Sequence, residues 1–125
     1  LYLFSTNVSM APLLHAKMPF DTLRDFAPMS RIGISPGGLI VHPSLPVHKV
    51  SDLVALAKAK PGSINFASAG TGSTAHLAGE QFKYLAGIDI VHVPYKGAGP
   101  ALAELMAGQV QMLISAYSSA FAHIQ

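Results

Sequence analysis

A short segment rich in glycine and hydroxyl side chains is the part of the chain best suited to hold a ligand: Ser68, Ala69, Gly70, Thr71, Gly72, Ser73, Thr74. Gly70 and Gly72 permit a tight turn and let a ligand approach the backbone amides. The next residues are predicted to open a helix, whose first N–H groups and dipole favour an anion. Ser73 and Thr74 add hydroxyl donors. The segment therefore predicts an anion site, with the alternative that Ser73 or Thr74 only caps its own helix.

The segment does not match either of two common nucleotide-binding signatures. A phosphate-binding Walker loop requires a lysine, and no lysine lies between Lys60 and Lys83. A dinucleotide fingerprint requires a third glycine, which does not follow Gly70-Thr71-Gly72 at the required place. Lys96, beside Tyr95, is either a charge partner for a bound carboxylate or a solvated loop lysine.

Catalytic and metal-binding patterns are weak. His76 and Glu80 share a helix face, which favours a surface pair over a metal site, and no two histidines have metal-ligand spacing. Ser68 or Ser73 with His76 gives a serine hydrolase as an alternative, but there is no Gly-x-Ser-x-Gly elbow and only Glu80 to orient the histidine. His92 alternates with apolar neighbours, which predicts a structural role. We expect no enzyme, no metal and no cofactor.

Composition excludes several classes of protein. The chain has 125 residues, 50% of them hydrophobic and 11% charged, which predicts one folded domain. The net charge is +2 and the basic residues are scattered, so we expect no nucleic-acid partner. There is no cysteine, and no apolar run approaches the ~20 residues of a membrane span.

The elements that must position the segment alternate regularly. One helix is predicted to begin at Ser51, which caps it, a second to span residues 74–86 and end at Gly87, and a third to span residues 100–107. In the second helix an apolar, inward face is predicted to consist of Ala78, Phe82, Leu85 and Ala86. Strands are predicted between these helices at 64–67, 90–93 and 110–114. This order predicts an α/β fold with a mostly parallel sheet flanked by helices. The loops 68–73, 94–99 and 115–119 then share the edge where ligands of such sheets bind.

The first forty residues give weaker predictions. We expect strands at Leu1–Ser5, Met29–Ile34 and Gly38–His42, a short helix between residues 7 and 15, and one helical turn capped by Asp21. Both ends of the chain look cut, which predicts a fragment.

Several stretches resemble the TctC or Bug family, the periplasmic substrate-binding proteins of tripartite tricarboxylate transporters. The stretches are the glycine-rich segment continuing into Ala75-His76-Leu77-Ala78-Gly79-Glu80, then His92-Val93-Pro94-Tyr95-Lys96-Gly97, and Gly108-Gln109-Val110. Phe20-Asp21, Asp25-Phe26-Ala27-Pro28, His42-Pro43-Ser44-Leu45-Pro46 and Leu56 through Gly62 are similar as well. The resemblance covers essentially the whole chain.

The resemblance implies a fold of two α/β lobes with a ligand cleft between them. Residues 1–26 would be a strand and connection of the first lobe, and residues 27–125 a second lobe of the type II periplasmic-binding-protein kind, incomplete at its end. It further implies capture of a small carboxylic acid without chemistry, a periplasmic location, and membrane transporter subunits as partners. Tyr95, Lys96, Ser115 and Ser118 would line the mouth of the site beside residues 68–74, and Ser5 and Thr6 would reach it from the first lobe.

The chain departs from the family pattern in two ways. The Pro-Gly-Gly loop that clamps the ligand from the first lobe is absent, and the acids usual near Gln111 and Ser115 are missing. A second alternative follows, a truncated module that forms a homodimer through exposed edges such as Leu1–Phe4.

Overall fold

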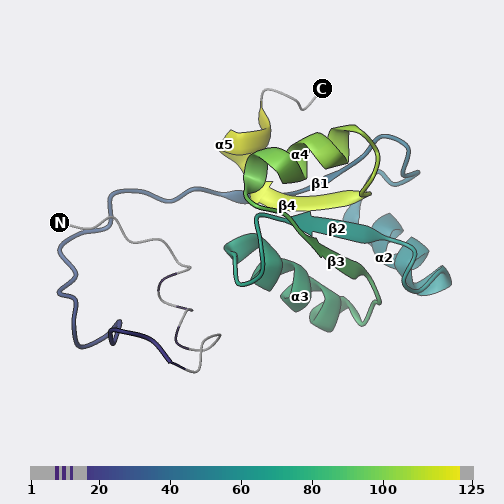
Figure 1. Ribbon diagram of the computed structural model, residues 1–125. Coiled ribbons are helices and arrows are strands. Elements are labelled where there is room, and N and C mark those ends of the chain that lie inside the picture. Colours follow the sequence, from purple (N-terminus) through teal and green to yellow (C-terminus); the bar gives the residue numbers. More distant parts are fainter. Residues whose placement is uncertain (1–7, 9, 11, 13–16, 122–125) are drawn as a thin grey trace. The chain divides into compact units, whose positions relative to one another are not determined.

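The computed structural model describes residue 8, residue 10, residue 12 and residues 17–121, and it divides into two compact units (Figure 1). The first unit is Leu1–Ile34 and the second is Ser35–Gln125. The predicted strand Leu1–Ser5 lies outside the described residues, as does most of the helix predicted before residue 16.

A single turn capped by Asp21 lies in the described part of the first unit. The Oδ1 atom of Asp21 accepts hydrogen bonds from the amides of Leu23 and Arg24, at 2.9 and 3.2 Å. The amide of Asp25 donates to the carbonyl oxygen of Asp21 at 2.9 Å, which closes the turn. The predicted cap and turn are therefore confirmed.

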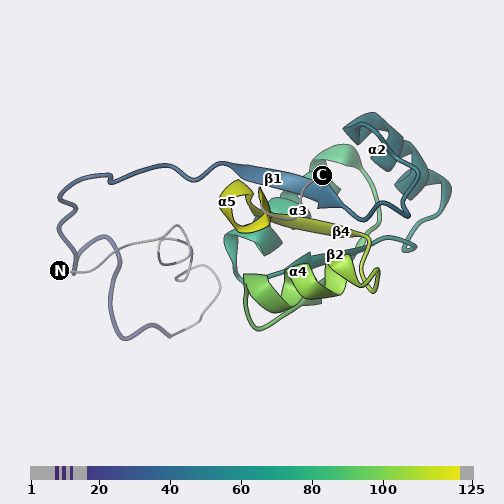
Figure 2. The same cartoon turned by 90° about the horizontal axis from the view of Figure 1, so that it is seen from above.

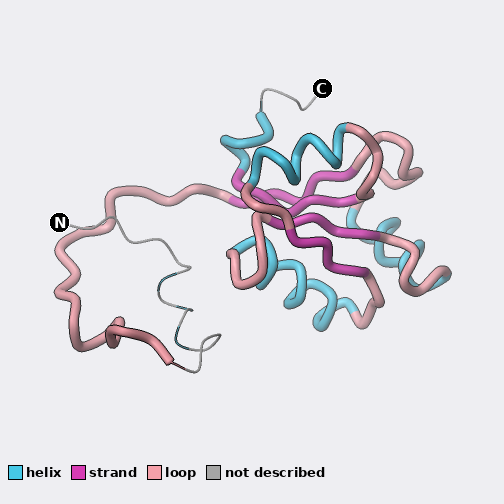
Figure 3. The backbone as a smooth tube through the Cα atoms, in the orientation of Figure 1, coloured by secondary structure: helices cyan, strands magenta, loops and turns pink. Residues whose placement is uncertain are grey.

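The predicted strand at Met29–Ile34 is wrong. Residues 26–36 form no helix or strand, and Figure 3 draws them as loop. The side chains of Met29, Ile32 and Ile34 are exposed. Apolar composition alone suggested a strand there, but no strand of the described residues pairs with the segment, and a strand without a ladder partner is not stable.

The second unit is built on a four-stranded sheet in the order β1-β4-β2-β3. Its strands are β1 (Gly37–Val41), β2 (Asn65–Ser68), β3 (Val91–Pro94) and β4 (Met112–Ala116). β2 pairs in parallel with both β3 and β4, which confirms the mostly parallel sheet. β1 pairs antiparallel with β4, so the sheet is mixed at that edge.

Helices cover both faces of this sheet: α2 (Val50–Ala59), α3 (Thr74–Ala86), α4 (Ala98–Met106) and the short α5 (Tyr117–Ala120). α2 and α3 lie on one face and α4 on the other, as Figures 1 and 2 show. No helix of the described residues is long and apolar enough to cross a membrane.

Side-chain alternation along the strands creates two hydrophobic clusters. Phe66 and Met112 pack with Leu53 of α2 on one face. Their neighbours Ala67 and Leu113 pack with α4 on the other face. Because successive strand residues point to opposite faces, β1, β2 and β4 each contribute to both clusters.

The helix α3 carries the candidate site at its first turn, and its bounds agree with the predicted ones. Ser73 is its N-cap, and Gly87 ends it with φ 59°, a left-handed conformation that suits glycine. The predicted inward position of Leu85 is wrong, since this side chain is 73% exposed. The buried position on this helix is Gly79, packed against the ring of Phe66.

Three predicted boundaries need correction. Lys49, not Ser51, is the N-cap residue of α2, and its side chain makes no capping hydrogen bond. Near this end of the helix, the side chain of Asp52 accepts a hydrogen bond from the amide of His48. α4 begins at Ala98, before Pro100. The predicted loop 115–119 is wrong, because β4 continues to Ala116 and α5 begins at Tyr117.

Candidate functional site

The carboxyl ends of the parallel strands bring two loops into contact. The amide of Tyr95 donates to the carbonyl oxygen of Ser68 at 3.0 Å. A Cβ atom on Gly70 would lie 3.2 Å from the carbonyl oxygen of Tyr95. The glycine-rich loop after β2 and the loop after β3 therefore lie side by side, as a parallel sheet requires.

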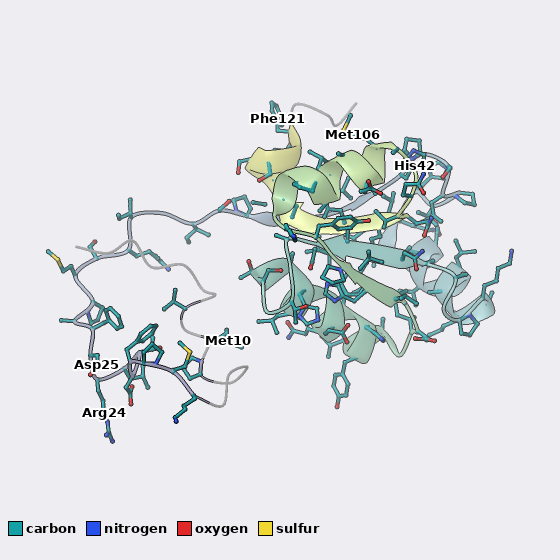
Figure 4. All side chains as sticks on the ribbon, in the orientation of Figure 1. Met10, Arg24, Asp25, His42, Met106 and Phe121 are labelled. Carbon is teal, nitrogen blue, oxygen red and sulfur yellow. The ribbon has the colours of Figure 1, made fainter. Side chains whose placement is uncertain are left out.

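The start of β1 and the end of β4 lie at the same edge. Gly37 pairs with Ala116, and the amide of Tyr117 donates to the carbonyl oxygen of Pro36 at 2.9 Å. Ser115 is half-buried in β4, and Ser118 is exposed in α5. His42, labelled in Figure 4, belongs to the opposite end of the sheet, where its Cε1 atom would lie 3.4 Å from a Cβ atom on Gly108.

The glycine-rich loop folds back on itself before α3 begins. Gly70 and Gly72 have φ values of 129° and 81°, which L side chains rarely adopt. The amide of Ser73 donates to the carbonyl oxygen of Gly70 at 3.1 Å. These two glycines are thus required by the turn itself.

The Oγ atom of Ser73 accepts a hydrogen bond from the amide of His76 at 3.2 Å. The capping role considered for Ser73 is therefore present in the structure. The amides of Thr71 and Ala75, in the part of the chain that the structure describes, have no acceptor. The first turn of α3 also carries no acidic side chain. The loop can therefore cap its helix and still offer N–H groups to an anion.

Replacing Ser73 by alanine removes this cap. We expect a loss of about 1 kcal/mol in the free energy of unfolding, the usual cost of an N-cap serine. Urea denaturation measures it, with Ser51→Ala as the control, because Ser51 is exposed and is not the cap of α2. Equal losses in the two variants would argue against the cap.

Ser68 is fully buried at the end of β2 and shapes the loop from below. Its Oγ atom lies 3.1 Å from both the amide nitrogen and the carbonyl oxygen of Gly70. The same atom lies 2.7 Å from Nε2 of His92. With three partners and no exposed surface, Ser68 acts on a ligand only through the shape of the loop.

A stack of three rings lies beside this serine. The ring centroids of Phe66 and His92 are 4.9 Å apart, and those of His92 and His76 are 4.1 Å apart. The amide of Gly72 donates to Nδ1 of His76 at 3.1 Å. His76 is thus tied to the glycine-rich loop, and the prediction of a surface pair with Glu80 missed this contact.

The stacking of these rings depends on the register between β2 and β3, which the periodicity of the sequence does not predict. Phe66 and His92 are partners in the β2–β3 ladder, so they share a face, and α3 lays His76 on top. The described residues contain no group of three His, Cys, Asp or Glu side chains that could hold a metal ion.

Burial lowers the pKa of His92 below its ordinary value, and His76 and Lys83 lower it further, while Glu80 opposes them. The folded protein therefore resists protonation of His92 more than the unfolded chain does. Stability should fall as the pH decreases through the unfolded value of about 6.5 and continue to fall down to the lowered folded value. Thermal unfolding at a series of pH values measures this.

The matched variant for this pH dependence is His92→Gln, which keeps an N–H donor for Ser68 without a titrating ring. Its stability should vary less between about pH 7.5 and about pH 5, the range of histidine titration. A variant as acid-sensitive as the wild type would rule out His92 as the source.

The pairing needed for the hydrolase alternative is not formed. The side chain of Ser73 accepts from the backbone of His76, and Nδ1 of His76 accepts from the backbone of Gly72. Ser68 contacts His92, not His76, and is inaccessible. The geometry shows a loop braced by side chains, not an activated nucleophile.

The remaining candidate residues are partly placed. Lys96 is exposed directly after Tyr95, so it can reach an anion from solvent. Tyr95 is half-buried, and burial, with Glu104 as a second cause, raises the pKa of its hydroxyl. The predicted residues Ser5 and Thr6 lie outside the described residues.

Comparison with known proteins assigns the family. A family model described as tripartite tricarboxylate transporter family receptor, TctC, matches residues 1–125. Protein BugT of Bordetella pertussis is 36% identical over 129 residues, covering 99% of this chain and 40% of the relative. The UPF0065 protein in the tcbD-tcbE intergenic region of a Pseudomonas species is 33% identical over 115 residues, covering 92% of this chain and 34% of the relative.

Solved structures agree with this fold. One described as a periplasmic transporter has a TM-score of 0.83 and 34% identity, covering 94% of this chain and 38% of that one. The R. palustris protein Rpa4515, solved with adipate, has a TM-score of 0.76 and 38% identity, covering 83% and 35%. MatC from Rhodopseudomonas palustris, solved with malate, has a TM-score of 0.67 and 27% identity, covering 70% of this chain and 30% of that one. The chain thus spans 30% to 40% of the length of these relatives.

Proposed function

The chain belongs to the TctC family of tripartite tricarboxylate transporter receptors, which are solute-binding proteins and not enzymes, and from this premise we propose that it captures a small carboxylate. The glycine-rich loop, residues 68–74, holds one carboxylate group of the ligand at the start of α3. The ligand is bound and released unchanged.

One observation carries this proposal: among the described residues the amides of Thr71, in the loop, and Ala75, in the first turn of α3, have no acceptor, and that turn has no acidic side chain. Such a helix start attracts negative charge through its amides and its dipole. Gly70 and Gly72 remove the side chains that would keep a ligand away from the backbone. Lys96, exposed in the neighbouring loop, adds a positive charge at the same edge.

The relatives support a dicarboxylate as the ligand. Two of the similar structures hold adipate and malate, each with a carboxylate at both ends. The loop and Lys96 provide for one such group, and Tyr95, Ser115 and Ser118 line the same edge. Contact of Ser5 and Thr6 with the ligand stays a prediction, since those residues lie outside the described part.

The family supports a wider role. We assign residues 1–26 to the first lobe and residues 27–125 to the second, as the family resemblance implies. The protein then works in the periplasm and delivers its ligand to membrane subunits of the transporter. Dimer formation through Leu1–Phe4 stays a prediction, since those residues lie outside the described part.

Calorimetry on the protein, at the full length that its gene encodes, tests the proposal. Adipate and malate are the probes, and adipamide is the control because it has the length of adipate without its charges. We expect heat of binding from at least one acid and none from adipamide. Equal binding of adipate and adipamide, or no binding by a wider panel of mono-, di- and tricarboxylates, would overturn the proposal.

A further inference from the structure

The hydrogen bonds around His76 and His92 indicate which ring nitrogen of each histidine donates and which accepts. The Oγ atom of Ser68 accepts from the amide of Gly70 and donates to the carbonyl oxygen of Gly70. Its third partner, Nε2 of His92, must then be a donor for all three contacts to be satisfied. Nδ1 of His76 is an acceptor, because the amide of Gly72 points its hydrogen at it.

We propose that His76 is a positioning residue for the anion-binding loop, which it holds only while its ring is neutral, so that acidification releases the loop. This inference rests on the proposed function of the same loop. The structural element is the single hydrogen bond from Gly72 to Nδ1 of His76. His92 supports the ring of His76 from below, and Ser68 anchors His92.

Protonation removes this bond for a simple reason. A charged imidazole carries a hydrogen on both nitrogens, so Nδ1 can no longer accept from Gly72. The ring would also bring a positive charge to the start of α3, where the helix dipole is unfavourable to cations. Its stacking partner His92 already resists protonation because of burial, so a charge cannot move to that ring at low cost.

The charged groups around the pair are few. α3 packs against β2, β3 and β4. On α3 itself, Glu80 favours a charged His92 ring and Lys83 opposes it. Lys83 also lies 3.9 Å from Asp89, which follows α3. β3 contributes only His92, and β2 and β4 contain no titratable side chain.

The first experiment needs no ligand. In ¹⁵N-labelled protein of full length, the Gly72 amide and Nδ1 of His76 should show the scalar coupling that an N–H···N hydrogen bond transmits. Ring nitrogen shifts should show both histidines protonated on Nε2. The coupling should be lost on acidification, once Nδ1 of His76 carries a proton. Absence of the coupling at neutral pH would overturn the inference.

Two variants separate the acceptor from the ring. His76→Phe keeps a stacked ring without an acceptor, and His76→Asn places an oxygen where Nδ1 stood. At neutral pH we expect His76→Phe to bind adipate or malate about fivefold more weakly, the effect of one hydrogen bond, and His76→Asn to restore most of the loss. On acidification both proteins should lose affinity as the acid itself is protonated, and the wild type should lose more than His76→Asn does.

The outcomes keep the two proposals apart. If neither acid binds but the coupling is present and lost in acid, the positioning role stands and the carboxylate function fails. If an acid binds and the affinities of His76→Phe and His76→Asn are equal, the ring only packs and the positioning role fails. Tighter binding in acid would also refute it, since a charged His76 would then simply attract the anion.

Discussion

Gly79→Ala is expected to lower the free energy of unfolding by about 3 kcal/mol, the upper part of the range for overpacked cores. A Cβ atom at this position would overlap Cε2 of the Phe66 ring and would also be too close to its Cζ and Cδ2 atoms. The ring of Phe66 is fully buried among Leu53 and Met112, so it has no space into which to move. A shift of this ring would also displace His92, which stacks on it.

Gly99→Ala is the matched control for this variant, since Gly99 also lies in a helix, α4. No heavy atom lies within 4 Å of a Cβ atom built there. Because Gly99 precedes Pro100, the gain in helix propensity from alanine is offset there, and stability should change by less than about 1 kcal/mol. Urea denaturation of the two variants gives the comparison. A Gly79→Ala protein as stable as the wild type would show that α3 does not pack this closely on β2.

Gly72→Val is expected to weaken carboxylate binding by about tenfold or more, equivalent to at least about 1.4 kcal/mol. The φ value of 81° at Gly72 is unfavourable for a branched side chain, so the loop must change conformation. The side chain would also stand beside the backbone amides that a ligand approaches. Calorimetry with the acid that binds the wild type measures the loss.

Gly87→Val is the matched control at the other end of the same helix. Gly87 has φ 59°, and no heavy atom lies within 4 Å of a Cβ atom there. Both variants should lose stability, by about 1 to 2 kcal/mol each, because of the left-handed backbone. Only Gly72→Val should lose affinity. Equal affinities in the two variants would place the ligand away from the glycine-rich loop.

Local signals made the helix α3 predictable to its ends. Its start follows from a serine cap and its end from Gly87, and both depend on a few neighbouring residues. The inward face was predicted less well. Helical spacing predicts Leu85 on the inward face, but this side chain is exposed. The ring of Phe66 in β2 packs against α3 at Gly79 instead, where it fits because glycine has no side chain.

Contacts between distant residues explain the other differences. The antiparallel position of β1 beside β4 joins residues about 75 positions apart, and no local pattern records such a pairing. The stack of His76 on His92 depends on the register of β2 and β3 and on the placement of α3. The glycine-rich loop was predictable as an anion site because glycines, a cap and a helix start are adjacent in the chain. Its support by His76 was not.

Amide chemical shifts during a titration test the central claim most directly. The ¹⁵N-labelled protein of full length is titrated with adipate and with malate, and adipamide serves as the uncharged control. A carboxylate held at the start of α3 should shift the amide signals of Thr71 and Ala75 most, since these N–H groups have no acceptor among the described residues. Saturating binding that leaves both signals unchanged would contradict the assignment of the site.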